Sequence, residues 1–76
     1  MTKKKKSIYI NLKELREDHD LKQKDVAKYI NVSPRTYSHY ENTEREIPIE
    51  IWKLLSKLYN QSIEYLSVVE EIDDNE

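Results

Sequence analysis

The chain has 76 residues with no cysteine, no glycine and two prolines, and its formal net charge at pH 7 is −2. A chain this short forms one small domain that buries about 60% of the surface its unfolded form exposes, which leaves little room for a walled enzyme cleft. The absence of cysteine excludes a disulfide scaffold and a thiolate metal site. No apolar run approaches the roughly 20 residues of a membrane span, and too few apolar residues follow Lys3–Lys6 for a secretory signal. These features predict a cytoplasmic, single-domain protein.

The charge is unevenly distributed along the chain. Residues 1–45 contain 11 Lys and Arg against 7 Asp and Glu, a net charge of +4, whereas residues 46–76 contain 2 against 8, a net charge of −6. A basic half can meet a polyanion while an acidic half faces away from it. The alternative is that both halves are ordinary solvated surface.

Helical spacing of apolar residues predicts an all-α fold of five helices. The first four run over about residues 11–18, 23–30, 34–42 and 48–59, and a fifth begins after residue 62 and carries Tyr65, Val68, Val69 and Ile72. Connections of a few residues favour a compact bundle. The only candidate strand is residues 7–10. We therefore expect a basic N-terminal arm at 1–10, one helical domain at 11–70 and an acidic, frayed tail at 71–76.

Several helix ends have recognisable signals. Asn11 with Glu14 resembles a capping box, and Ser33 before Pro34 places a capping hydroxyl ahead of a proline at the first helical position. Ser62 is the cap expected for the fifth helix. Asn31 and Asn60 stand where glycine commonly closes a helix in the left-handed conformation.

The third predicted helix has two different faces. Tyr37, Tyr40 and Glu41 share one face, because residues three and four apart are neighbours on a helix. The opposite face carries short groups able to form hydrogen bonds, at Pro34, Arg35, Ser38, His39 and Asn42. Asn31-Val32-Ser33 joins this helix to the preceding one. Two short helices so joined, the second polar on its outer face, form a helix-turn-helix.

Three segments carry a resemblance to a known family. They are Leu21-Lys22-Gln23-Lys24-Asp25-Val26-Ala27, Ile30-Asn31-Val32-Ser33 and Tyr37-Ser38-His39-Tyr40-Glu41-Asn42, and the match continues at residues 47–51 and 60–66. Over about residues 11–66 the chain resembles the DNA-binding domain of lambda-repressor/Cro-like (Xre-type) regulators. The resemblance implies a five-helix fold whose third helix enters the major groove of double-stranded DNA, usually as a dimer on a palindromic site.

The resemblance also implies roles for individual residues. Gln23 matches a glutamine that meets the phosphate backbone and braces the recognition helix, and Arg16 with Glu41 matches a structural salt bridge between the first and third helices. The expected DNA-binding residues are Gln23, Ser33, Pro34, Arg35, Thr36, Ser38, His39, Asn42 and Thr43.

Some positions depart from the family pattern. Lys22 stands where a capping Thr or Ser is common, and Pro34 replaces a residue that often donates to a base. Asp20, Asn31 and Thr43 replace glycines, and Thr43 is the least comfortable of the three in a left-handed conformation.

Alternative interpretations stay open for several side chains. Arg35 favours guanine if it reaches a base, because its guanidinium matches the O6 and N7 acceptors. Ser38 can act as a contact or as mere filler, and Thr36 can meet a thymine methyl or a phosphate, or pack against the second helix. Tyr37, Tyr40, Tyr59 and Trp52 suit base stacking in principle, but their spacing with Leu and Ile favours core packing.

The chain ends suggest two interactions. Lys3–Lys6 is either a solubilising tail or an arm along phosphates, where it would add affinity that is insensitive to sequence. Tyr65, Val68 and Ile72 leave apolar surface on the fifth helix that a homodimer would cover. The alternative is that the chain past Leu66 folds back or frays.

The sequence thus predicts a transcriptional regulator, most simply a repressor, that binds double-stranded DNA. The alternative is a protein-interaction module of the same fold, such as an antitoxin or anti-repressor-like adaptor, whose acidic half engages a basic partner. An enzyme is not expected, because there is no glycine-rich phosphate loop, no cysteine nucleophile and no carboxylate cluster around a histidine. Two histidines without cysteine make a zinc site improbable. No cofactor, small-molecule substrate or membrane association is expected.

Overall fold

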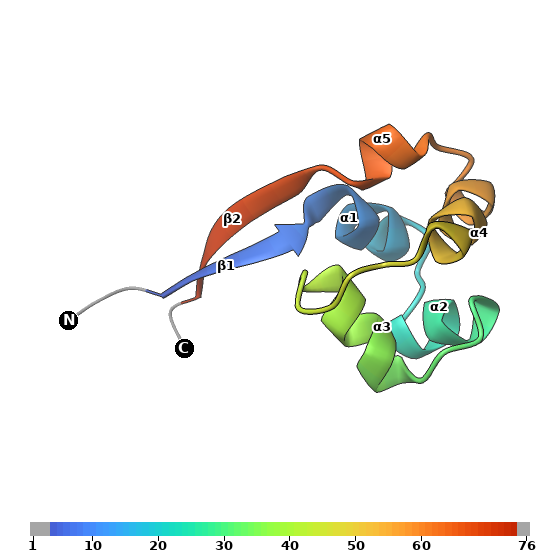
Figure 1. The fold of residues 1–76 in the computed structure, drawn as a ribbon, viewed down its shortest axis with the longest axis horizontal. Helices are drawn as coiled ribbons and strands as arrows, with labels where there is room; N and C mark the ends of the chain where they lie inside the picture. The colour runs from blue at the N-terminus through green and yellow to red at the C-terminus, as the bar shows by residue number, and fades with distance from the viewer. Residues whose placement is uncertain (1–3, 75–76) are drawn as a thin grey trace.

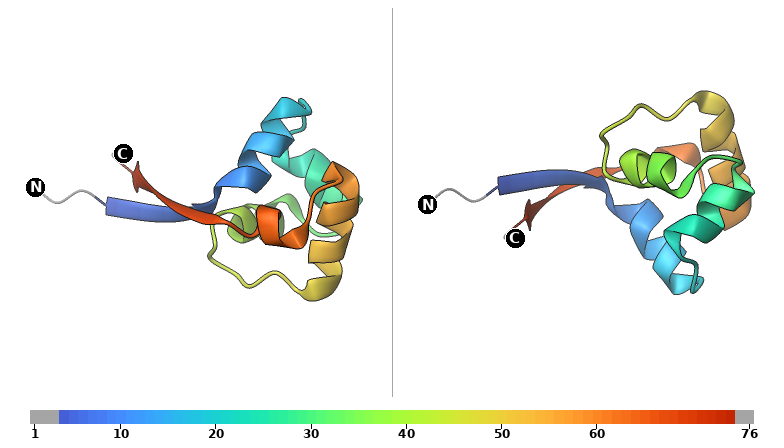
Figure 2. Two further views of the ribbon diagram at one scale, coloured as in Figure 1. Left: turned by 90° about the horizontal axis from the view of Figure 1, so that it is seen from above. Right: turned by 90° about the horizontal axis from the view of Figure 1, so that it is seen from below.

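The computed structural model describes residues 4–74 and contains five helices and two strands among them. In chain order these elements are β1 (Lys4–Tyr9), α1 (Ile10–Asp18), α2 (Gln23–Tyr29), α3 (Pro34–Glu41), α4 (Ile49–Tyr59), α5 (Ile63–Leu66) and β2 (Val69–Asp74). The helices gather into one body, and the antiparallel pair of strands extends from that body in one direction (Figures 1 and 2). None of the helices in this described part is long and apolar enough to cross a membrane.

Two of the three expected capping side chains are confirmed. The Ser33 hydroxyl accepts a hydrogen bond from the Thr36 amide at 3.0 Å, and Pro34 occupies the first position of α3. The Ser62 hydroxyl accepts from the Tyr65 amide in the same way. The expected cap at Asn11 is wrong, because α1 already begins at Ile10. Asn11 therefore lies inside the first turn, and its side-chain amide donates to the Tyr65 carbonyl at 2.9 Å.

Four helices end in left-handed residues that are not glycine. Positive φ angles of 54° to 63° occur at Asp20, Asn31, Thr43 and Asn60. After α3, the Thr43 amide bonds the Tyr40 carbonyl and the Glu44 amide bonds the His39 carbonyl, which is the Schellman pattern. Asp20, Asn31 and Thr43 thus adopt the left-handed conformation expected at positions where the family often has glycine.

The expected length of the fifth helix is wrong. α5 ends at Leu66 with Ser67 as its cap, so Val68 and Ile72 do not lie on a helix, and residues 69–74 form β2. A longer helix would have carried four carboxylates near its C-terminus, where the helix dipole disfavours negative charge. Two of these four, Asp73 and Asp74, lie opposite Lys5 and Lys4 when residues 69–74 are extended. Residues 71–74 of the expected frayed tail are therefore paired.

The charges of the two strands are complementary. Lys4, Lys5 and Lys6 lie opposite Asp74, Asp73 and Ile72 in the register. Residues 4–9 are thus a paired strand rather than a free arm, while residue 3 of the lysine run lies outside the described residues. The strands together carry three lysines and four carboxylates. Neighbouring strands are about 4.8 Å apart, less than the Debye length of about 8 Å in physiological salt, so the opposite charges largely cancel at a distance.

One apolar core joins all five helices. Its buried members are Leu12, Val26, Ala27, Ile30, Tyr37, Tyr40, Ile47, Leu55, Tyr59 and Leu66. Trp52 is half-buried beside this core, and its ring meets that of Tyr9 edge-on at 5.2 Å between centroids. Packing, rather than base stacking, accounts for these aromatic side chains. The Tyr9–Trp52 contact and buried Ile8 also attach the base of the strand pair to the helices.

The left-handed turn after α1 gives a stability prediction. We expect the free energy of unfolding to be highest for Asp20→Gly, intermediate for wild type and lowest for Asp20→Val. Glycine accepts a positive φ freely, whereas a β-branched residue does not. The Asp20→Val variant should lose about 1–2 kcal/mol, measured by urea denaturation. As a control, Asp18→Gly lies within α1 and should lose about 0.3 kcal/mol, the difference between the helix propensities of aspartate and glycine. A gain in stability from Asp20→Val would contradict this account of the turn.

Candidate nucleic-acid interface

The helix-turn-helix predicted from sequence is present. α2 and α3 pack together, and the connection of residues 31–33 places half-buried Val32 against the core. Tyr37, Tyr40 and Glu41 are buried on the inner side of α3. Pro34 and Arg35 are exposed, and Ser38 and His39 are partly exposed. The division of the helix into an aromatic inner face and a polar outer face is therefore confirmed.

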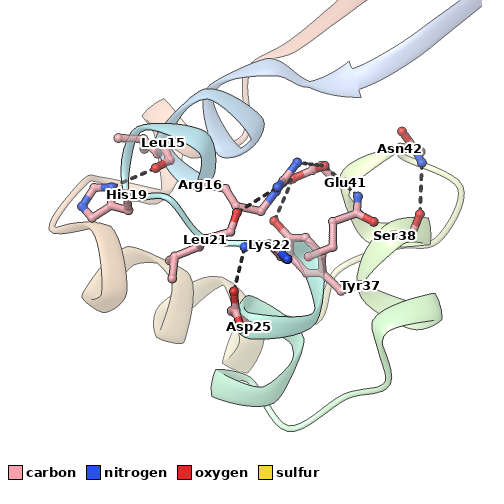
Figure 3. Close-up of polar contacts among 11 residues, drawn as sticks. Leu15, Arg16, His19, Leu21, Lys22, Asp25, Tyr37, Ser38, Glu41 and Asn42 are labelled. Atoms are coloured by element: carbon pink, nitrogen blue, oxygen red, sulfur yellow. Dashed lines mark hydrogen bonds and ion pairs between the residues drawn. The ribbon is translucent and has the colours of Figure 1, made fainter.

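The buried carboxylate of Glu41 fixes the orientation of α3. Only 3% of Glu41 is exposed. Its Oε2 accepts from Arg16 Nε at 3.0 Å and from the Tyr37 hydroxyl at 2.9 Å, while its Oε1 accepts from Arg16 Nη2 at 3.3 Å and from Gln23 Nε2 at 3.0 Å. Figure 3 shows the Arg16 and Tyr37 groups converging on this carboxylate. The salt bridge expected between the first and third helices is thus confirmed.

The surroundings of this carboxylate shift the pKa values of its donors. Burial lowers the pKa of Arg16, but the hydrogen bond and the charge of Glu41 more than offset it, so that the pKa is raised overall. Burial and the neighbouring Glu41 charge raise the pKa of Tyr37 well above its usual range. Both shifts keep the two side chains in the protonated form that donates to Glu41. A buried charge requires such partners, because an unpaired one is strongly destabilising.

The side chain of Gln23 stabilises the position of α3, as expected from the sequence. It begins α2, and its side-chain amide reaches across to Glu41 on α3. Lys22, which precedes it, offers no oxygen that could cap the helix. Instead, the Asp25 carboxylate accepts from the Lys22 amide at 2.8 Å. α2 is thereby capped from within, although the usual capping residue is missing.

The first turn of α3 is held by its own side chains. The Ser33 hydroxyl donates to Thr36 Oγ1 at 2.9 Å while it accepts from the Thr36 amide. Thr36 is thus engaged locally and only partly exposed. Arg35 is exposed and forms no hydrogen bond or ion pair with the residues that the structure describes. Its guanidinium is therefore available to a ligand at the outer surface of the helix.

Four further predicted residues lie in the last turn of the helix or directly after it. The Asn42 amide donates to the Ser38 hydroxyl at 3.4 Å, and His39 Nδ1 lies 2.7 Å from Glu44 Oε1. The Thr43 hydroxyl donates to the Ser7 carbonyl at 3.2 Å, which ties the turn to β1. Ser38, His39, Asn42 and Thr43 are each partly exposed.

Sequence reasoning missed two residues at this surface. The sequence analysis gives Glu44 no role, yet its carboxylate contacts His39. The available signal was an acidic residue directly after a left-handed position, which turns the chain back over the helix. Ser7 contributes only its carbonyl to Thr43, and no side-chain pattern announces such a contact. Within residues 4–74, no group of three or more histidine or acidic side chains could hold a metal ion.

Comparisons with known proteins agree with this geometry. A family model described as helix-turn-helix matches residues 12–66. A crystal structure of a transcriptional regulator from Listeria innocua superposes with a TM-score of 0.72 and 29% sequence identity, covering 95% of this chain and 65% of that chain.

Two curated proteins are similar over shorter parts of their lengths. The chain is 33% identical over 61 residues to the antitoxin PezA of Streptococcus pneumoniae, which covers 80% of this chain and 37% of that protein. It is 29% identical over 55 residues to YobD of Bacillus subtilis, an uncharacterized HTH-type transcriptional regulator, covering 72% of this chain and 49% of that protein. The chain therefore spans half or less of the length of these relatives.

Two buried tyrosines provide a matched test of the Glu41 network. Tyr37→Phe removes one donor from a buried carboxylate and should lower the free energy of unfolding by about 1–3 kcal/mol. Tyr59→Phe should change it by less than about 0.5 kcal/mol or raise it, because the buried Tyr59 hydroxyl has no hydrogen-bond partner among the described residues. Burial also raises the pKa of Tyr59 to about 12. Urea midpoints at constant m-value measure both effects, and equal losses would refute the role given to Tyr37.

Proposed function

Because the chain belongs to the helix-turn-helix family, we propose that it is a sequence-specific transcriptional regulator that reads the major groove of double-stranded DNA with α3. One observation carries this proposal. The inner side of α3 is fully committed to the core through Tyr37, Tyr40 and Glu41, whereas Arg35 and His39 remain at the surface one helical turn apart. The polar outer face is thus available for a ligand and is held rigidly.

Different residues would take different parts in binding. Arg35 and His39 would contact base edges, and Pro34, Ser38 and Thr36 would line the same groove. Gln23, Ser33, Asn42 and the amide of Thr43 would contact phosphates and set the register on the backbone. The positions of these residues support this division. Those proposed to contact phosphates lie at the start of α2 and at the two ends of α3, on either side of the exposed centre of α3.

The biological setting extends the proposal. We expect a cytoplasmic repressor that blocks a promoter by occupying it. A homodimer would place two copies of α3 on half-sites about one helical turn of DNA apart. The sequence places the dimer surface along the fifth helix, but α5 ends at Leu66 and cannot provide it. The surface available for this dimer is an apolar patch at the junction of α5 and β2, formed by Tyr65, Val68 and Val69, each of which is 44% to 50% exposed.

A protein-interaction role is the second candidate. The similarity to part of a protein named as an antitoxin favours it. The two roles are compatible, because α3 and β2 occupy different parts of the molecule (Figure 1). Fold similarity alone does not choose between them. Copurification of a basic partner protein with the chain would support the second role.

The main proposal predicts the effect of removing Arg35. Arg35→Ala should lose base preference at one position of each half-site and weaken specific binding by about 1–3 kcal/mol. The control Lys57→Ala removes one positive charge from exposed α4 and should keep that preference. Binding to the chain's own upstream DNA and to a scrambled duplex, each at two salt concentrations, measures both quantities. If Arg35→Ala prefers the same DNA site as wild type, the role of Arg35 in base recognition is wrong.

The proposed dimer gives a separate prediction. Val68→Lys should raise the dimer dissociation constant at least about tenfold, because it places a charge in the apolar patch. Ile49→Lys is the matched control, since Ile49 is a 53% exposed apolar residue on α4, outside the patch. Sedimentation equilibrium measures both constants. The proposed surface is wrong if only Ile49→Lys dissociates the dimer, or if neither change does.

A further inference from the structure

The pair formed by His39 and Glu44 lies at the proposed DNA-reading surface and has a defined geometry. His39 Nδ1 is 2.7 Å from Glu44 Oε1, and the two side chains are 36% and 58% exposed. No other described residue bonds the imidazole, so its Nε2 is open to a ligand. The pair is therefore a contact within the reading face rather than a part of the core.

The turn after α3 holds Glu44 in this place. Thr43 has φ 58°, which sends the chain back over the last turn of the helix. The Glu44 amide bonds the His39 carbonyl at 2.8 Å, so that backbone and side chain of Glu44 both contact His39. The Thr43 hydroxyl is anchored to the Ser7 carbonyl of β1. Glu44 is thus fixed by the fold beside His39 instead of meeting it by chance.

The chemistry of the pair defines the position of a proton. An ionised carboxylate only accepts hydrogen bonds, so the imidazole nitrogen that faces it must carry the hydrogen. In the neutral imidazole the other nitrogen then has a lone pair and no hydrogen. His39 Nε2 is therefore an acceptor in this tautomer. Without Glu44, nothing among the described residues would select this tautomer over the other one.

We propose that Glu44 is a positioning residue that fixes the tautomer of His39, so that Nε2 accepts a hydrogen bond from the amino group of adenine or cytosine. This inference rests on the proposed function. In the major groove, adenine N6 and cytosine N4 are donors, whereas guanine and thymine present acceptors at the corresponding edges. Glu44 thereby determines which bases His39 accepts without touching DNA itself.

The proposal gives α3 two complementary reading groups. Arg35 can only donate, which suits the acceptors of guanine, and it lies four residues before His39 on the same face. His39 held by Glu44 can only accept in its neutral form. A half-site should therefore combine a guanine with an adenine or a cytosine at a nearby position of the strand that His39 contacts. Site selection distinguishes adenine from cytosine at that second position.

The first test uses DNA site selection from a randomised duplex library at pH 8, which favours neutral imidazole. The base position that His39 contacts is identified as the one at which His39→Ala no longer shows a base preference. Wild type should prefer adenine or cytosine there by roughly tenfold. Glu44→Ala and the isosteric Glu44→Gln should both relax this preference, because alanine offers no acceptor to the imidazole and an amide can donate as well as accept. Glu46→Ala removes the same charge from another exposed residue and should leave the preference unchanged.

The second test needs no DNA. In the free protein at pH 8, the nitrogen chemical shifts of the His39 ring should report a hydrogen on Nδ1, and Glu44→Gln should populate the other tautomer. A hydrogen on Nε2 in wild type overturns the proposal, and so does an unchanged base preference in Glu44→Ala. If the protein selects no DNA site at all, the proposed function fails together with the base assignment, whereas a selected site that depends on Arg35 but not on Glu44 refutes this inference alone.

Discussion

The buried negative charge of Glu41 is the constraint on which the orientation of the third helix depends. Four hydrogen bonds reach this carboxylate from α1, α2 and α3 itself, so the three helices must keep their relative positions for the charge to stay compensated. A purely apolar contact would tolerate sliding of α3 along its axis, whereas directional hydrogen bonds do not. The polar network thus converts a general packing of helices into a defined presentation of Arg35 and His39.

Features determined by neighbouring residues could be predicted from the sequence. The starts at Ser33 and Ser62 and the left-handed residues at Asn31 and Asn60 follow from local chemistry, and the structure contains all four. The strand pair could not be predicted in the same way, since Lys5 meets Asp73 from the other end of the chain. A helical pattern in residues 62–72 competed with that pairing, and only the fold shows which of them is stabilised by a partner.

The candidate site divides along the same line. Its outward residues follow from the spacing of Tyr37 and Tyr40, because burial of one helix face leaves the opposite one exposed. The contacts that adjust the site, from Glu44 to His39 and from Thr43 to Ser7, depend on how a turn re-enters the surface. Side-chain periodicity contains no information about that path. The location of the candidate interface was therefore predictable, and its finer hydrogen bonding was not.

The pairing of β1 with β2 has a consequence for the order of folding. The strands belong to opposite ends of the sequence, and closing so long a loop costs entropy that the local helical contacts avoid. The helices can assemble earlier, because their core is already complete at Leu66. Folding is therefore expected to finish with the pairing of β1 and β2.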